Sequence, residues 1–176
     1  MIYTSDEMEK AAVFEVAGLM CAAARTAPKG RGLDNIKALV LDGADKDGLS
    51  AEMRRIDAEC NGEGPFGRDA GNIDASDYVV LIGAVNGKRG LKLCGLCGFA
   101  NCAASAAAGA NCVFDISDLG IAVGSAVSVA ADHRVDNRVM FSAGYAAARL
   151  GLFPKNVRVA YGIPVSVTGK SIYFDR

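Results

Sequence analysis

Four cysteines lie close together in the middle of the chain, and their type and spacing could support chemistry. They follow a C-x2-C-x4-C-x9-C spacing: Cys94, Cys97, Cys102 and Cys112. Thiols this close in one short segment usually share a metal ion, a cluster or a disulfide bond. The polar, acidic N-terminus does not resemble a signal peptide, so we expect a cytoplasmic protein, in which disulfides are rare. Two other cysteines, Cys21 and Cys60, are interpreted as structural.

Three states of this cysteine-rich stretch remain open: an iron–sulfur cluster, a zinc ion and unligated core cysteines. Structural zinc prefers two short cysteine pairs separated by a longer loop, but only Cys94 and Cys97 form such a pair. Three crowded thiols with a fourth farther along suit the corners of a 4Fe–4S cluster. Gly95 and Gly98 would allow the backbone to approach the cluster sulfides. The spacing therefore favours a 4Fe–4S cluster.

A cationic loop follows the first predicted helix. Arg25, Lys29 and Arg31 supply positive charge, and Gly30 and Gly32 free their backbone amides. The loop is either a solvated connection or an anion-binding loop, because free amides and cations together bind anions. The sequence contains no Walker-type signature, Ser-His-Asp set or paired acid–base motif, so hydrolase and kinase functions are unsupported.

Length and composition limit the class of protein. The chain has 176 residues, 51% of them hydrophobic, and a net charge of −1. This length predicts a single domain over 1–176, with a cysteine-rich segment at 88–113 inside it. Because no basic cluster stands out, we expect no nucleic-acid binding. Apolar runs are interrupted by charge or glycine before about 18 residues, which predicts no membrane-spanning helix.

The elements that must position these residues alternate between helices and strands. Capping signals and periodicity predict helices at about 4–25, 49–60, 116–131 and 138–150, with start signals at Thr4, Ser50, Asp115 or Ser117, and Asn137. Strands are predicted at 36–41, 77–84 and 157–161, with loops at 26–35 and 62–75. The second strand is continuously apolar, which is typical of burial on both faces. The alternation predicts an α+β or α/β layered domain.

The helix predicted at 116–131 has one face of small residues: Gly120, Gly124, Ser125 and Ser128. Such a face allows close packing against a neighbouring helix or a second subunit. His133, the only histidine, lies at the end of this helix. A histidine there interacts favourably with the helix dipole, and we prefer this structural interpretation to a role in proton transfer. The polar tail at 165–176 is a second candidate for contact with a partner subunit.

The cysteine motif resembles the small 4Fe–4S module of carbon monoxide dehydrogenase/acetyl-CoA synthase subunits and Rnf-type electron-transport proteins. That module reads C-x2-C-G-x3-C followed by a later cysteine. The likeness covers about twenty residues and implies four cluster ligands: Cys94, Cys97, Cys102 and Cys112. The gap before Cys112 is shorter than the module's usual final spacing.

Nearly the whole chain resembles the uncharacterised "ferredoxin domain-containing" family, domain of unknown function 2148. The matching pieces are residues 24–30, the cysteine motif, residues 118–122, and residues 161–164 running to Gly169-Lys170. The family name asserts no activity, so it implies a ferredoxin-like segment without a defined reaction.

A weaker likeness is to nitroreductases, in which a helix is followed by A-P-S-x-x-N and a late G-Y-P turn. Residues 26–28 with Asn35 beyond, and residues 161–164, keep that order. Nitroreductases are FMN-binding homodimers, so the likeness implies a homodimer with FMN near a set of candidate residues: Arg25, Lys29, Arg31, Asn35 and Lys170. The chain lacks their N-terminal R-R-S-x-R phosphate motif.

These expectations describe an α+β, nitroreductase-like layered domain with a cysteine-rich, cluster-binding loop. The leading function is 4Fe–4S electron transfer to or from an unknown redox partner. The alternatives are an FMN-dependent nitroreductase-like oxidoreductase and a binding module stabilised by structural zinc.

Overall fold

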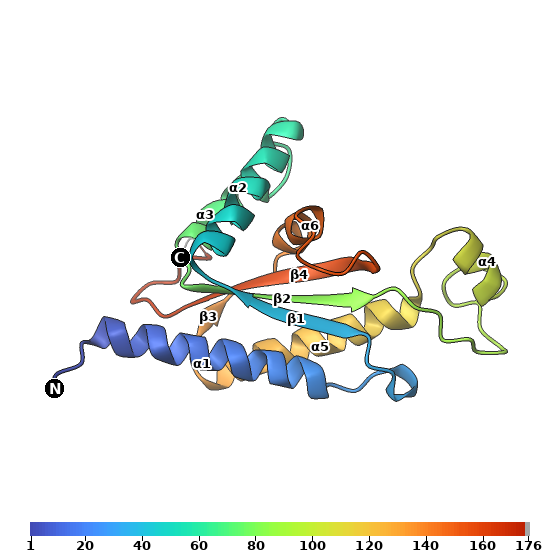
Figure 1. Ribbon diagram of the computed structural model, residues 1–176, viewed down its shortest axis with the longest axis horizontal. Helices are drawn as coiled ribbons and strands as arrows, with labels where there is room; N and C mark the ends of the chain where they lie inside the picture. The colour runs from blue at the N-terminus through green and yellow to red at the C-terminus, as the bar shows by residue number, and fades with distance from the viewer. Residues whose placement is uncertain (175–176) are drawn as a thin grey trace.

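The computed structural model describes residues 1–174, which form a four-stranded antiparallel sheet between two layers of helices (Figure 1). The strands are β1 (Ile36–Leu41), β2 (Tyr78–Val85), β3 (Asp136–Asn137) and β4 (Val157–Ser166), in the order β1-β2-β4-β3. One face is covered by α1 (Ser5–Thr26) and α5 (Val113–Asp132). The other is covered by α2 (Gly43–Glu59), α3 (Phe66–Asp74) and α6 (Phe141–Arg149). A short helix, α4 (Cys102–Ala107), and a 3-10 turn, η1 (Gly30–Gly32), lie in the connections.

The central strand β2 holds the two helical layers together. Val80 and Ile82 pack against α1 and α5, whereas Val79 and Leu81 pack against the opposite layer, and all four are 0% exposed. Each fully buried aliphatic side chain of this size contributes about 1.5–3 kcal/mol. The structure confirms the prediction that this strand is buried on both faces.

Helix α6 lies unusually close to β4 because two glycines face the contact. A Cβ on Gly144 would lie 1.9 Å from the carbonyl oxygen of Ala160, and one on Gly162 would lie 2.5 Å from the Cβ of Ala143. No residue with a side chain fits at either position unless the backbone shifts. The pair of glycines therefore determines how closely the helix packs on the strand.

Helix α2 begins at Gly43 rather than at Leu49, and Ser50 lies inside it instead of capping it. A buried lysine accounts for the difference. The Nζ atom of Lys46 donates to the carbonyl oxygens of Ile73 at 3.2 Å and Asp74 at 3.4 Å, at the end of α3. This tertiary contact outweighs the loop propensity of the glycines and aspartates that precede Leu49.

The stretch 62–75, predicted as a loop, contains α3. Its buried residues are Phe66, Asp69, Ala70 and Ile73, which recur at helical spacing. This pattern can be seen in the sequence, but Gly62, Gly64 and Pro65 just before it are typical of a loop. The side chain of Phe66 points inward and is 8% exposed.

Three boundaries in the C-terminal half also differ from the prediction. Helix α5 begins at Val113, α6 begins at Phe141, and β4 continues to Ser166. Asn137, the predicted start of the last helix, belongs to β3 and pairs with Val165. Strand β4 does not end at Tyr161, because residues 162–165 continue the antiparallel pairing with β2.

The C-terminal tail packs on its own chain as far as it is described. Tyr173 is 3% exposed, and its hydroxyl oxygen lies 3.0 Å from the Oγ atom of Ser76. The side-chain nitrogen of Asn72 in α3 donates to the carbonyl oxygen of Ile172 at 2.7 Å. Residues 175 and 176, which belong to the tail predicted to contact a partner, lie outside the described residues.

By length and composition alone, α5 could cross a membrane. The sequence analysis had predicted no membrane-spanning helix. In this fold its buried residues, among them Leu119, Ala122 and Ala126, belong to the core cluster shared with α1 and the sheet. A helix that packs in a core meets the same criteria, so the composition of α5 is weak evidence for a membrane span.

Candidate functional site

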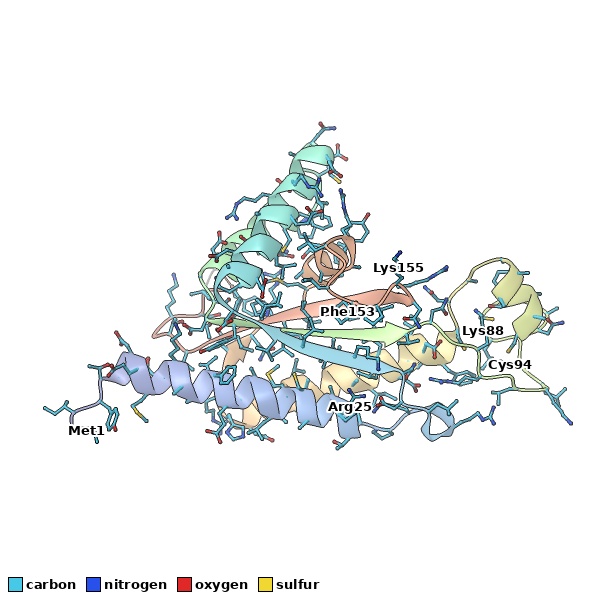
Figure 2. All side chains as sticks on the ribbon, in the orientation of Figure 1. Met1, Arg25, Lys88, Cys94, Phe153 and Lys155 are labelled. Atoms are coloured by element: carbon cyan, nitrogen blue, oxygen red, sulfur yellow. The ribbon has the colours of Figure 1, made fainter. Side chains whose placement is uncertain are left out.

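The cysteine segment, residues 88–113, projects from one end of the sheet between β2 and α5 (Figure 1). Cys94 lies in this segment, beyond the end of the sheet (Figure 2). Cys94, Cys97 and Cys102 are partly exposed free thiols, and Cys112 is buried at the start of α5. The four predicted ligands therefore belong to one protruding part of the molecule.

The two remaining cysteines lie elsewhere, as predicted. Cys21 is in α1 and packs against the hydrophobic core, and burial raises the pKa of its thiol. A neutral, packed thiol of this kind is structural. Cys60 follows α2 and is an exposed thiol, so its interpretation as a structural residue receives no support from packing.

The four thiols share one segment, but across residues 1–174 no three histidine, cysteine, aspartate or glutamate side chains are grouped to hold a metal ion. The predicted convergence of the thiols on one site is therefore not visible as a formed site. The chemistry of the donors does fit such a group, because thiolates are the protein ligands of iron–sulfur clusters and of zinc.

The surroundings of Cys97 favour the thiolate form. Hydrogen bonds from the backbone of Phe99 and from the hydroxyl of Ser105, together with the positive charge of Lys88, lower the pKa of Cys97. Ser105 is 1% exposed, and Lys88 Nζ donates to its Oγ atom at 2.9 Å. A sulfur that accepts such hydrogen bonds is typical of a thiolate that binds a metal or cluster.

A buried ion-pair network closes the base of the cysteine segment. Arg89, which precedes the first cysteine of the segment, pairs with Asp118 and, at 2.9 Å, with Asp115. All three are buried. Because the two aspartates lie in the first turns of α5, one guanidinium joins the two ends of the segment. Asp115 does not cap α5 as predicted: the helix begins at Val113, and the carboxylate turns inward.

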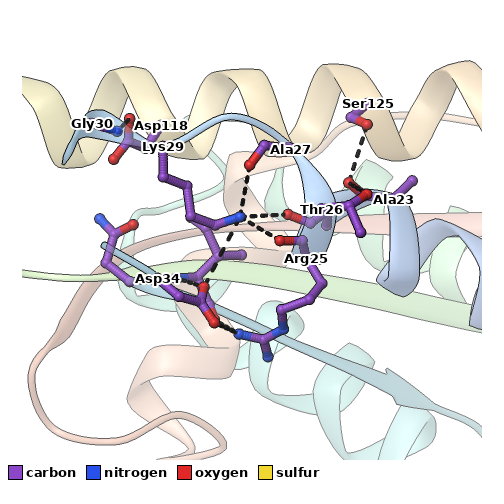
Figure 3. A network of polar contacts seen from close by, with 12 residues as sticks. Ala23, Arg25, Thr26, Ala27, Lys29, Gly30, Asp34, Asp118 and Ser125 are labelled. Carbon is purple, nitrogen blue, oxygen red and sulfur yellow. Dashed lines mark hydrogen bonds and ion pairs between the residues drawn. The ribbon is translucent and has the colours of Figure 1, made fainter. Parts of the chain in front are cut away.

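The network extends to the loop after α1. The backbone amide of Gly30 donates to Asp118 at 2.9 Å (Figure 3). Asp115 accepts hydrogen bonds from the Nδ2 atom of Asn35 at 2.9 Å and from the backbone amide of Gly87 at 2.8 Å. Both buried carboxylates are therefore hydrogen-bonded as well as paired, which such groups require.

Lys29, a candidate for anion binding, caps α1 instead. Its Nζ atom donates to the carbonyl oxygens of Arg25 at 2.5 Å and Ala27 at 2.8 Å, and its side chain is 6% exposed (Figure 3). A lysine at this position satisfies carbonyl groups that the helix leaves unpaired and interacts favourably with its dipole.

The other candidates for a flavin site lie in different surroundings. Arg25 pairs with Asp34, and the Nη1 atom of Arg31 donates to the carbonyl oxygen of Arg89 at 2.6 Å. Lys170 is exposed in the C-terminal tail. The cationic loop therefore lies against the base of the cysteine segment, and its cations already have partners within the chain.

Four buried polar atoms at the base of the cysteine segment lack a hydrogen-bond partner in the described part of the chain. They are Arg89 Nε and the side-chain oxygens of Asn35, Asn86 and Asn111. An unsatisfied buried group costs about 1–3 kcal/mol, so a bound group or ordered water there would account for them. Sequence reasoning found Asn35 through the nitroreductase likeness. It missed the other three: Asn86 and Arg89 lie in the loop after β2, Asn111 lies just before α5, and no motif joins them.

Residues 108–176 match the family described as uncharacterized protein containing a ferredoxin domain (DUF2148). An uncharacterized protein from Archaeoglobus fulgidus is 38% identical over 184 aligned residues, which cover 100% of this chain and 98% of the relative. The similarity to this relative therefore includes the cysteine segment and the first helix as well as the C-terminal half.

Solved structures share the fold at low sequence identity. A nitroreductase with bound FMN from Desulfitobacterium hafniense matches with a TM-score of 0.63 and 12% identity, over 97% of this chain and 81% of that chain. An FMN-dependent nitroreductase from Clostridium difficile has a TM-score of 0.57 and 15% identity, over 89% of this chain and 77% of that chain. These matches confirm the predicted nitroreductase-like α+β fold.

Proposed function

We propose a redox role for this chain, which belongs to the DUF2148 family of uncharacterized proteins containing a ferredoxin domain. The observation that carries the proposal is that four free thiols share one projecting segment. Its residues Cys94, Cys97, Cys102 and Cys112 would hold a 4Fe–4S cluster. When bound, such a cluster supplies one-electron transfer.

The surrounding residues tune and support this centre. The hydroxyl of Ser105 and the backbone of Phe99 contribute hydrogen bonds to the sulfur of Cys97, and the charge of Lys88 lies near it. Hydrogen bonds and positive charge at a ligand sulfur stabilise added negative charge and so raise a reduction potential. Arg89 holds the ends of the segment together. An unidentified redox partner supplies or accepts the electrons.

Anaerobic purification with iron, sulfide and visible-absorption analysis tests the proposal. We expect about four iron atoms and about four sulfides per chain, as in a 4Fe–4S protein. Cys97→Ala is expected to lose them, and Cys60→Ala, which removes an exposed thiol outside the segment, is expected to keep them. A colourless protein that retains zinc would favour the zinc-stabilised binding module. A wild-type chain that retains neither metal after reconstitution would contradict both.

A second candidate is an FMN-dependent oxidoreductase, favoured by the nitroreductase-fold structures whose names include FMN. The residues proposed to contact the flavin are Arg25, Lys29, Arg31, Asn35 and Lys170. Of these, Arg25, Lys29, Arg31 and Asn35 already have partners within the chain, and Lys170 is exposed.

Titration of the apo protein with FMN separates this candidate from the first. A charge-assisted phosphate contact contributes about 1.5–3 kcal/mol, which corresponds to at least about tenfold in affinity. If the loop binds the phosphate, the Lys29→Ala/Arg31→Ala variant is expected to bind FMN at least about tenfold more weakly than wild type. Equal binding by both proteins would remove the loop from the site. Absence of binding by wild type would leave the cluster as the only proposed cofactor.

A further inference from the structure

A pocket of about 360 Å³ lies between α6 and β4, and no cysteine lines it. We call it the α6–β4 pocket. One wall is formed by Phe141 and Tyr145 of α6, which are spaced so that they lie on one helical face, and the other by residues 158–161 of β4. Its volume falls in the range of about 300–1,000 Å³ that small-molecule sites occupy. Neither the cluster nor the flavin proposed above uses these residues.

The floor of the pocket consists of small residues. Gly144 lies directly over the backbone of Ala160, where no side chain on the helix would fit. Ala148 continues the same face of α6 and is exposed. A floor without protruding side chains accommodates a flat molecule better than a bulky, branched one.

The two aromatic residues of the α6 wall, Phe141 and Tyr145, are supported by a buried ring. Phe141 and Tyr145 are 54% and 53% exposed, which is high for large aromatic side chains. Phe66, itself buried, contacts both rings nearly edge-on, with centroid distances of 5.8 Å and 6.0 Å. Exposed aromatic rings supported in this way favour a planar aromatic ligand, because ring pairs prefer stacked or edge-on contacts.

The two arginines of the pocket differ in their charge balance. Arg149 is bound by Glu59 through two hydrogen bonds of 2.6 Å and 3.0 Å and pairs with Glu52 at 3.1 Å, so its charge is compensated. Arg158 donates from Nη1 to the carbonyl oxygen of Gly109 and pairs with no carboxylate among the described residues. The pocket therefore has one exposed guanidinium that lacks an anionic partner and favours a carboxylate ligand.

We propose that the α6–β4 pocket binds a planar aromatic carboxylate of one or two rings. The ring packs against Phe141 and Tyr145, and the carboxylate binds the guanidinium of Arg158. Because Arg158 also contacts Gly109 in the cysteine segment, the ligand lies next to that segment. Binding itself requires neither a cluster nor a flavin, so it is tested separately from the redox role.

Isothermal titration of the purified full chain with naphthoate tests the proposal. We expect saturable binding of one naphthoate per chain. Two related compounds serve as ligand controls: naphthol keeps the rings without the carboxylate, and cyclohexanecarboxylate keeps the carboxylate without an aromatic ring. Both are expected to bind at least about tenfold more weakly. Absence of saturable naphthoate binding by wild type at millimolar concentration overturns the proposal.

Three variants locate the binding site. Arg158→Gln is expected to weaken naphthoate binding at least about tenfold. Ala148→Leu is expected to abolish it by filling the pocket from an exposed helix position that tolerates leucine. Lys155→Gln, a nearby exposed residue that does not line the pocket (Figure 2), removes the same charge and is expected to bind like wild type. Equal affinity of the Arg158 and Lys155 variants, or full binding by Ala148→Leu, overturns the assignment. Circular dichroism verifies that each variant is folded.

Discussion

Arg89 connects the cysteine segment to the body of the molecule at the scale of single residues. It lies between Asp115 and Asp118 with an exposure of only 5%, and the two carboxylates also accept hydrogen bonds from the protein. The gain from forming such a buried network is offset by desolvation, but removal of one member leaves the others without compensation. The network therefore affects the stability of the fold most when one of its members is removed.

Substitution of Arg89 measures this dependence. Arg89→Ala leaves two buried carboxylates unpaired, so we expect the free energy of unfolding to fall by about 3–5 kcal/mol in urea denaturation. Lys92→Ala, an exposed cation in the same segment, is expected to change it by no more than about 0.5 kcal/mol. If the two variants were equally stable, the ion pairs would not hold the segment in solution.

At the scale of elements, two contacts determine how the C-terminal third of the chain packs. Helix α6 reaches the backbone of β4 at Gly144. The tail after β4 is anchored by Tyr173, whose hydroxyl contacts Ser76 beyond the end of α3. In both cases a single residue type, glycine in one and tyrosine in the other, makes the contact possible.

The helix–strand contact is tested by adding one methyl group. Gly144→Ala places a Cβ atom 1.9 Å from the carbonyl oxygen of Ala160, so α6 must move away from β4. We expect a loss of about 1–3 kcal/mol in the free energy of unfolding. Gly48→Ala in α2, where an added Cβ meets nothing within 4 Å, is the control and is expected to stabilise the chain by about 0.5–1 kcal/mol.

The tail contact predicts a dependence of stability on alkaline pH. Burial raises the pKa of Tyr173 from the ordinary 10.0 to about 12. The folded state therefore favours the protonated phenol, and the stability that this group contributes is complete below pH 10 and decreases as the pH rises toward 12. Denaturant titrations between these pH values should show that the free energy of unfolding falls more steeply with pH for wild type than for Tyr173→Phe. Parallel curves would mean that the phenol is not buried in solution.

At the scale of the whole molecule, the outer surface of the α1–α5 layer carries exposed apolar and small residues. The outward faces of α1 and α5 expose Leu19 at 42% and Ile121 at 46%, together with Gly120 and Gly124. The predicted face of small residues is thus divided, because Ser125 donates to the carbonyl oxygen of Ala23 in α1 (Figure 3) while the glycines face outward. We propose that a second copy of the chain packs on this surface.

Light scattering at micromolar concentration tests the proposed homodimer. Wild type is expected to have the mass of a dimer, and Gly124→Gln the mass of a monomer. An added side chain at Gly124 meets nothing within 4 Å in the single chain, and glutamine is a better helix former, so unfolding would not explain the change. Gly71→Gln, an equally open glycine in α3, is the matched control and should remain a dimer. A monomeric wild type would contradict the proposal.

Features that depend on neighbouring residues could be predicted without knowledge of the fold. The start signal at Thr4 began α1 as predicted, because Thr4 and its capping-box partner Glu7 lie within one helical turn. The apolar run of β2 predicted burial on both faces, and the spacing of the cysteines identified one segment as the candidate for cluster chemistry. These signals are local, so they can be read without knowledge of the fold.

Contacts between residues far apart in the chain could not be predicted in this way. Lys46 extends α2 because it reaches the end of α3, and Asp115 turns inward because Asn35 and Arg89 lie there. Each of these contacts joins residues far apart in the chain, and hydrogen-bonding potential alone does not specify a partner. The energy of a buried polar group depends on the groups that surround it after folding, so the base of the cysteine segment became visible only when the segments were brought together.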